Sequence, residues 1–335
     1  MKKQTKLVAV LSTAALLAIG ASMTSFAATG WAEEDGTWVY YDRNGDKVTD
    51  KWAKSGNNWY YLDSNGEMAV DTLIEDGDNY YYVDVNGVMA ANQWVAIDNE
   101  DAGDDDEPEH YWYYFQANGK ALKQGDSDKV SLKTVNGKKY AFDDEGKMLY
   151  GWVDENSAER IDNTDDDAFK DGVYYFGGED DGAMTTGWLL IDVSYDEATN
   201  DDYKYTAPTF NDDDDQTRWF YFKSNGKRAE NEKITYKGKS YYFDTDGKML
   251  TGWVTTGEGK ESVNEASTFE DGHTFYCDET GARVEGAWVK DTKPGTSDDD
   301  ADEDEHWYYL KKTTGKPATG KQANVNGQIY IFNDQ

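Results

Sequence analysis

The chain has 335 residues, and its 33 Lys and Arg against 67 Asp and Glu give a formal net charge of −34. A negative field of this strength repels phosphate groups and attracts cations, so it excludes nucleic acid and anionic membrane surfaces as partners. Only 38% of the residues are hydrophobic while 15% are aromatic. This composition excludes one large aliphatic core and favours a thin, elongated fold stabilised by aromatic side chains.

The first 27 residues have the composition of a signal peptide. Three lysines precede an apolar stretch over residues 7–19, and small residues before position 28 favour cleavage after Ala27. The stretch is shorter than the roughly 20 residues that cross a bilayer, so we expect no membrane insertion after cleavage. The sequence therefore predicts a secreted protein whose mature part is residues 28–335.

A repeat of 21 residues organises residues 29–95. The units open at equally spaced positions: Trp31, Trp52, Leu73 and Trp94. In each of the first three units, one aromatic residue follows the opening residue seven positions later, and a second follows nine positions later. Each of these units then closes with Asp-x-Asn-Gly. The aromatic run predicts a short β-strand, and Asn-Gly predicts a tight turn after it. Each unit of about 20 residues therefore predicts one β-hairpin around that turn, and such hairpins must stack to be stable.

Residues 96–335 continue the pattern with longer loops. Gly-Trp recurs at Trp152, Trp188 and Trp253, and a block of about 100 residues is repeated there. The longer loops contain the acidic runs Asp104–Glu107, Asp165–Asp167, Asp212–Asp215 and Asp298–Glu305. Alignment of the short units places Gln335 inside a hairpin, so we expect the last unit to be incomplete and the chain to be naturally short or a fragment. The predicted fold class is all-β: an elongated solenoid of stacked β-hairpin repeats.

The repeat unit resembles the cell-wall-binding repeat family of Gram-positive bacteria, which includes choline-binding and glucan-binding repeats. The resemblance is carried by Gly-Trp, Trp-Tyr-Tyr, Asp-x-Asn-Gly and Met, as in Trp52, Trp59, Tyr61, Gly66 and Met68. It implies ligand cages between hairpins, built from the strand aromatics of one unit and the Trp that opens the next. A quaternary ammonium group is attracted to such rings by about 0.5–2 kcal/mol each.

The residues that this resemblance assigns to ligand binding form four sets. The two most complete cages are Trp38, Tyr40 and Trp52, and Tyr80, Tyr82, Met89 and Trp94. Two further sets are Tyr175, Met184 and Trp188, and Tyr242, Met249 and Trp253. The methionines also suit plain packing. Leu73 replaces the cage Trp at the second junction, and Ala141 replaces a cage Tyr, so those junctions are expected to be closed or damaged.

Other chemistry is weakly indicated. The acidic runs predict solvated loops, with weak millimolar Ca²⁺ binding as the alternative, because none follows the spacing that wraps one calcium ion. The three histidines have no partners at zinc-ligand spacing, and Cys277 aligns with apolar strand residues, which predicts a core position. No catalytic motif stands outside the repeats, so we expect no catalytic residues and no resident cofactor.

Two functions are consistent with these features. The first is non-catalytic binding of a cell-surface polymer, either choline-bearing teichoic acid or a glucan, on the envelope of the producing cell. The alternative is a structural or adhesive surface spacer that displays its acidic loops to a protein or host partner. The aromatic cages favour the first function, whereas the long acidic loops favour the second.

Overall fold

The protein is described by a computed structural model over residues 29–102, 107–161, 168–192, 217–257, 262–270, 272–296, 305–320 and 322–333. The predicted signal peptide lies outside the described residues, as do most of the acidic runs. The chain divides into two compact units. The first contains residues up to 97 together with 112–123, and the second contains residues 98–111 and 124–335.

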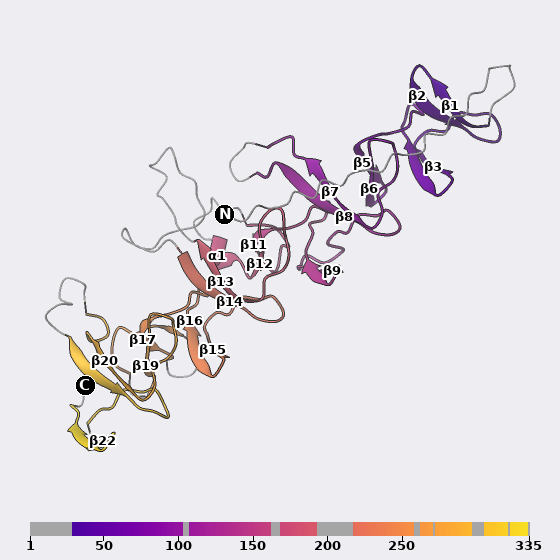
Figure 1. Ribbon diagram of the computed structural model, residues 1–335. Helices are drawn as coiled ribbons and strands as arrows, with labels where there is room; N and C mark the ends of the chain where they lie inside the picture. The colour runs from indigo at the N-terminus through magenta and orange to yellow at the C-terminus, as the bar shows by residue number, and fades with distance from the viewer. Residues whose placement is uncertain are drawn as a thin grey trace, which may run out of the picture. The chain divides into compact units, whose positions relative to one another are not determined.

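The first unit is a succession of antiparallel hairpins (Figure 1). Their strands are β1 (Gly30–Glu34) with β2 (Thr37–Tyr41), β3 (Lys51–Ser55) with β4 (Asn58–Leu62), β5 (Thr72–Asp76) with β6 (Asn79–Val83), and β7 (Gln93–Asp98) with β8 (His110–Phe115). The tip of the last hairpin, residues 98–111, falls in the second unit.

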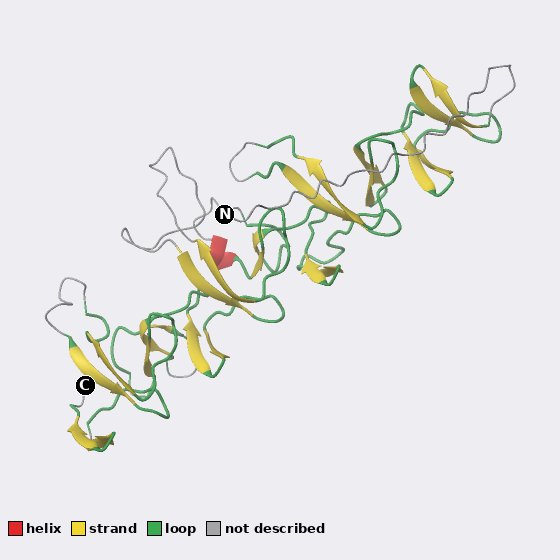
Figure 2. Ribbon diagram, in the orientation of Figure 1, coloured by secondary structure: helices red, strands yellow, loops and turns green. Residues whose placement is uncertain are grey.

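The second unit repeats the same element with longer connections. Its hairpins are β9 (Lys133–Val135) with β10 (Lys138–Tyr140), β11 (Gly151–Val153) with β12 (Tyr174–Phe176), β13 (Gly187–Asp192) with β14 (Thr217–Phe222), β15 (Glu232–Tyr236) with β16 (Lys239–Phe243), β17 (Gly252–Thr255) with β19 (Thr274–Cys277), β20 (Ala287–Asp291) with β21 (His306–Leu310), and β22 (Gln322–Val325) with β23 (Gln328–Ile331). A short strand, β18 (Asn264–Glu265), adds to β17, and one helical turn, α1 (Ala168–Asp171), precedes β12 (Figure 2). The predicted all-β class of hairpin repeats is confirmed.

The hairpin turn lies elsewhere than the sequence predicted. β3 comes before β4 and joins it through Gly56 and Asn57, so that Trp52 lies opposite Tyr61. The Asp-x-Asn-Gly segment follows the hairpin instead. There the Asp63 carboxylate accepts the N–H groups of Asn65 and Glu67, both at 2.8 Å. The side chain closes this turn locally. The returning chain therefore makes isolated bridges, Leu62 to Met68 and Val39 to Glu67, rather than a further strand, before the next hairpin begins.

Successive hairpins of the first unit are joined by a recurring backbone bond. The N–H of Met68, just after one hairpin, donates to the carbonyl of Trp38 in the hairpin before it at 2.7 Å, and Met89 does the same to Trp59 at 2.9 Å. The Met68 side chain then packs under the next turn, where a Cβ on Gly87 would lie 2.9 Å from its sulfur. Gly87 also has a φ of +75°, so glycine is required there for two reasons. These bonds stack the hairpins.

The core is a series of small apolar clusters rather than one large one. Leu62, Val83 and Phe115 are fully buried in the first unit. In the second unit Cys277 is 1% exposed and packs in a cluster with Tyr242 and Phe275, which confirms its predicted core position. Burial raises the pKa of the Cys277 thiol to about 12, so this thiol is protonated at neutral pH.

Candidate ligand-binding site

A three-ring contact is the recurring feature of the junctions between hairpins. The opening Trp of a hairpin contacts the aromatic ring opposite it on the second strand and a ring of the following hairpin. Both contacts are edge-on or tilted. Ring centroids are 4.8–5.2 Å apart in the triplets Trp31–Tyr40–Tyr60, Trp52–Tyr61–Tyr81, Trp152–Tyr175–Phe220, Trp188–Tyr221–Tyr241, Trp253–Tyr276–Tyr308 and Trp288–Tyr309–Tyr330. We call each triplet a junction and name it by its Trp.

A second tryptophan turns the Trp188 junction into an open cage. Trp219 stands on β14 two residues before Tyr221, on the same face of the strand, and its ring lies at 82° to Trp188 with centroids 6.3 Å apart. Tyr241 from β16 lies 4.8 Å from Trp188 on another side. Tyr236 and Phe243 also contact Trp188, with centroids 6.0 and 5.6 Å away. Because Trp219 is 42% exposed and Trp188 is half-buried, solvent still reaches this group of rings.

The Trp288 junction has the same arrangement around a pocket. Trp288, Trp307 and Tyr330, with Ile331 and Phe332, line a cavity of about 520 Å³. Trp307 stands two residues before Tyr309, the ring opposite Trp288. Trp219 has the same position relative to Tyr221, the ring opposite Trp188. It is 62% exposed, so its ring face is available to a ligand.

The first unit holds the equivalent residues at its first two junctions. Trp38 stands two residues before Tyr40, and Trp59 stands two residues before Tyr61. The ammonium of Lys54 lies over the Trp59 ring, 5.6 Å from its centroid, so a cation of the chain itself already uses this ring face.

Carboxylates lie beside the aromatic rings. The Trp52 indole N–H donates to the Asp76 carboxylate at 3.1 Å, and burial together with this carboxylate raises the pKa of Tyr81. In the second unit, burial and a hydrogen bond to Asp291 raise the pKa of Tyr276. Neutral rings with negative charge at their edges form an environment that suits a cation.

Two junctions of the second unit are closed. Trp152 is 1% exposed and Trp253 is 8% exposed, and the place of the second tryptophan is taken by Val173 and Thr274 respectively. The carbonyl of Thr292 accepts the indole N–H of Trp253 at 2.8 Å. These two junctions are therefore part of the core.

The sets predicted from sequence are distributed differently in space. Trp52 contacts Tyr61 and Tyr81, whereas the predicted partner Tyr40 contacts Trp31. Trp38, Tyr40 and Trp52 therefore belong to two successive junctions. Register is the reason, because each Trp pairs with the aromatic of its own hairpin rather than with that of the preceding one.

The other predicted sets are divided in the same way. Tyr82 stacks on Phe115 and Trp94 meets Tyr114, while Lys123 lies over Tyr80. Tyr175 contacts Trp152 rather than Trp188, and Tyr242 stacks on Phe275 in the core while Trp253 contacts Tyr276 and Tyr308. The three methionines pack beside turn glycines of following hairpins: Met89 beside Gly119, Met184 beside Gly226 and Met249 beside Gly281.

Sequence reasoning missed several rings of these junctions. These are Tyr60, Tyr81, Trp219, Tyr241, Trp288, Trp307 and Tyr330. The signal was present in the Trp-Tyr-Tyr run, because its first residue shares a strand face with its third and not with its second. Pairing the opening Trp with the strand that follows it would have found Trp219 and Trp307, but not the rings that the next hairpin contributes.

In the part of the chain that the structure describes, there is no group of three or more His, Cys, Asp or Glu side chains that could hold a metal ion. The acidic runs lie mainly outside that part, so calcium binding stays a prediction. Within the same residues, no helix is long and apolar enough to cross a membrane.

The fold and the cages define the class: an all-β repeat protein with open aromatic cages between stacked hairpins. Residues 28–72 and 48–94 match the family described as choline-binding repeat, and residues 234–249 match one described as a cell wall binding repeat. These matches confirm the resemblance of the repeats to the cell-wall-binding repeat family. They support binding of a cell-surface polymer as the function of the array.

The curated relatives are longer proteins. Glucosyltransferase-S of Streptococcus mutans is 28% identical over 221 residues, which is 66% of this chain and 10% of the relative. Glucosyltransferase-I of Streptococcus downei is 24% identical over 262 residues, covering 66% of this chain and 15% of the relative. The chain thus spans about a tenth to a seventh of these enzymes.

Two similar solved structures come from Streptococcus pneumoniae. CbpJ is 21% identical with a TM-score of 0.45, and the match covers 90% of this chain and 91% of that one. The modular autolysin LytC, in complex with a synthetic peptidoglycan ligand, is 20% identical with a TM-score of 0.48, covering 91% of this chain and 51% of that one.

Proposed function

We propose that this protein binds choline-type quaternary ammonium groups of a cell-surface polymer, such as choline-bearing teichoic acid, in its open aromatic cages. The single observation that carries the proposal is the Trp188 cage, where Trp219 and Tyr241 meet Trp188 at steep angles around a solvent-accessible site. Each ring face contributes about 0.5–2 kcal/mol to binding a quaternary ammonium, depending on how far the cation is desolvated.

Charge favours a cation over a neutral ligand. The chain carries a net charge of −34, which concentrates cations near its surface. Lys54 over Trp59 is an internal example of an ammonium group held on a ring of this kind. A chain with many weak cages gains affinity for a polymer because the second and later contacts are intramolecular.

A glucan is the second candidate ligand. The glucosyltransferase relatives favour it, and so do the open faces of Trp219 and Trp307, because aromatic faces also stack on sugar rings. On either ligand the protein acts as a non-catalytic binder at the cell surface after export. The spacer alternative depended on acidic loops that lie mainly outside the described residues, and it is not favoured.

The test is a titration of the purified chain followed by Trp fluorescence, with three ligands. Choline is compared with its uncharged isostere 3,3-dimethyl-1-butanol and with an α-glucan oligosaccharide. We expect saturable binding of choline and weak binding of the isostere. Preference for the glucan would replace the proposed ligand, and no response to any of the three, with no retention on purified choline-bearing walls, would overturn the proposal.

A matched pair of variants assigns the cage. Trp219→Ala removes one wall of the Trp188 cage, and we expect the number of bound cholines per chain, measured by equilibrium dialysis, to fall by one. Leu190→Ala is the control, because Leu190 is the strand partner of Trp219 and is 45% exposed. It should leave the number unchanged. Equal effects of both substitutions would contradict the assignment.

A further inference from the structure

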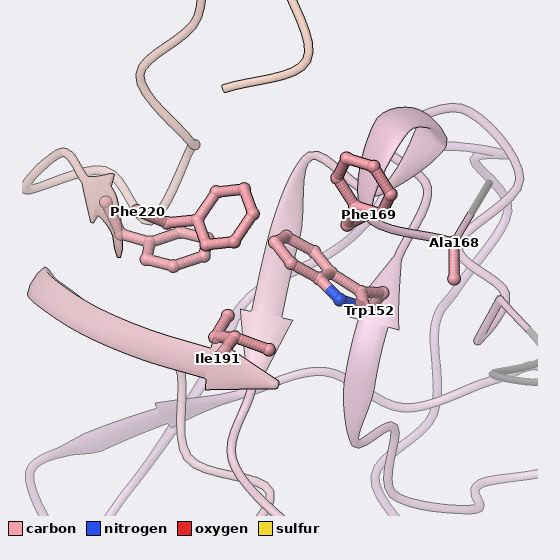
Figure 3. Packing of buried hydrophobic residues seen from close by; sticks show 6 residues of the cluster. Trp152, Ala168, Phe169, Ile191 and Phe220 are labelled. Atoms are coloured by element: carbon pink, nitrogen blue, oxygen red, sulfur yellow. The ribbon is translucent and has the colours of Figure 1, made fainter. Parts of the chain in front are cut away.

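The closed Trp152 junction contains a further ring, which comes from the connection between its two strands. Phe169, on the turn of α1, is fully buried with Trp152 and Phe220, and its centroid lies 6.2 Å from that of Phe220. Figure 3 shows Trp152 between Phe169 on one side and Phe220 on the other. Phe169 therefore packs into the Trp152 junction, where Val173 stands at the sequence position of the second tryptophan.

Phe169 is held in place by groups distant in sequence. The guanidinium of Arg228, which is 3% exposed, donates to the carbonyl of Phe169, and to that of Lys170 at 3.0 Å. Gly172 allows α1 to approach Trp152, because a Cβ there would lie 2.7 Å from Cε3 of Trp152. The phenyl ring is thus a positioned part of the junction rather than the end of a loose loop.

The same device occurs about 100 residues later. Phe269 lies 5.0 Å from Trp253 at 82° and 5.5 Å from Tyr308, so it contacts two of the three rings of that junction. Both insertions contain the sequence Phe-x-Asp-Gly, at Phe169–Gly172 and Phe269–Gly272. At both junctions the second tryptophan is missing, so loss of that ring and gain of the phenylalanine occur together.

We infer that Phe169 and Phe269 occupy the ligand position of their junctions, so that closed and open junctions alternate in the second unit. This inference rests on the proposed function and deepens it, because it names the residues that decide which junctions take a quaternary ammonium. A benzyl group and a choline cation are similar in size, and both present methyl or ring C–H groups to aromatic faces. Removing the benzyl group leaves three rings around a cavity at the Trp152 junction.

The test counts binding sites. Purified wild type, Phe169→Ala, Phe269→Ala and the double variant are each titrated with choline by equilibrium dialysis. We expect one additional site in each single variant and two in the double variant. Phe169→Leu is the control, because leucine still fills the space, and it should add no site. An unchanged number of sites in both alanine variants would overturn the inference.

Thermal unfolding keeps the test decisive if a variant is weakly folded. Saturating choline should raise the Tm of each alanine variant by several degrees more than that of wild type, because the ligand refills the cavity. The half-buried Phe269 offers the milder of the two substitutions. If wild type binds no choline and the alanine variants do, the proposed function fails and the inference stands. If wild type binds and the variants bind no more, the inference fails alone.

Discussion

The hairpins that open with Trp152 and Trp188 follow one another in the second unit, and both tryptophans make the same pair of ring contacts. Nevertheless, Trp152 is 1% exposed, whereas the Trp188 junction carries the 42% exposed Trp219. In the Trp152 hairpin, the connection between the two strands brings Phe169 into the junction. The comparison teaches that one repeat geometry is closed into the core at one junction, by a residue outside the repeat consensus, and keeps an exposed ring at the next.

The largest expected difference between the two junctions is in stability. Trp152→Ala should lower the free energy of unfolding by about 3–5 kcal/mol, because it leaves a cavity among fully buried rings. Trp219→Ala should cost about 1 kcal/mol, since much of that ring is already exposed to water. Denaturant unfolding followed by circular dichroism measures both. Similar losses in the two variants would remove the distinction between closed and open junctions.

An intermediate effect is expected at the anchor of Phe169. Arg228→Met keeps the side-chain volume but leaves the carbonyls of Phe169 and Lys170 without their donor, which should cost about 1–3 kcal/mol. Hydrogen exchange should rise in residues 168–173 and stay unchanged around Trp188. Glu230→Gln is the comparison: it removes the charge that faces the buried guanidinium at 2.8 Å but leaves both carbonyl bonds in place, so exchange in residues 168–173 should rise less than in the Arg228 variant. Exchange that is unchanged in the Arg228 variant would contradict the anchoring role.

The smallest expected effect concerns the turn that follows a hairpin and is closed by an Asp carboxylate. This turn has different surroundings in the two units. In the second unit, burial raises the pKa of Asp143 to about 6, although its carboxylate accepts N–H bonds from Glu145 and Lys147. In the first unit, the same turn lowers the pKa of Asp42, because bonds from the N–H groups of Asp46 and Asn44 outweigh desolvation.

The two shifts have opposite consequences for stability. The contribution of Asp143 is fully present below its unfolded pKa of 3.8 and is lost as the pH rises through about 6. The contribution of Asp42 is present above 3.8 and is lost as the pH falls through its lowered pKa. From pH 4 to 7, wild type should therefore lose about 1–2 kcal/mol relative to Asp143→Asn. From pH 5 to 3, wild type should lose stability relative to Asp42→Asn. Slopes of the same sign would show that the two turns share one environment.

Much of the fold followed from the spacing of aromatic residues. A repeat of 21 residues with strand formers and turn residues at constant positions predicts stacked hairpins, because a single hairpin cannot bury its own aromatic face. The core position of Cys277 followed from the same alignment. These features depend on neighbours that are close in sequence, so local pattern was sufficient to predict them.

The membership of each cage needed the tertiary structure. The sequence placed Trp188 in a cage but paired it with Tyr175, whereas strand register puts it with Tyr221 and the next hairpin puts Tyr241 beside it. Closure of the Trp152 junction depends on Phe169, whose carbonyl is bonded by Arg228, 59 residues further along the chain. The repeat itself was decided by short-range pattern. The difference between an exposed and a buried junction was decided by contacts across long sequence separations, which no local spacing records.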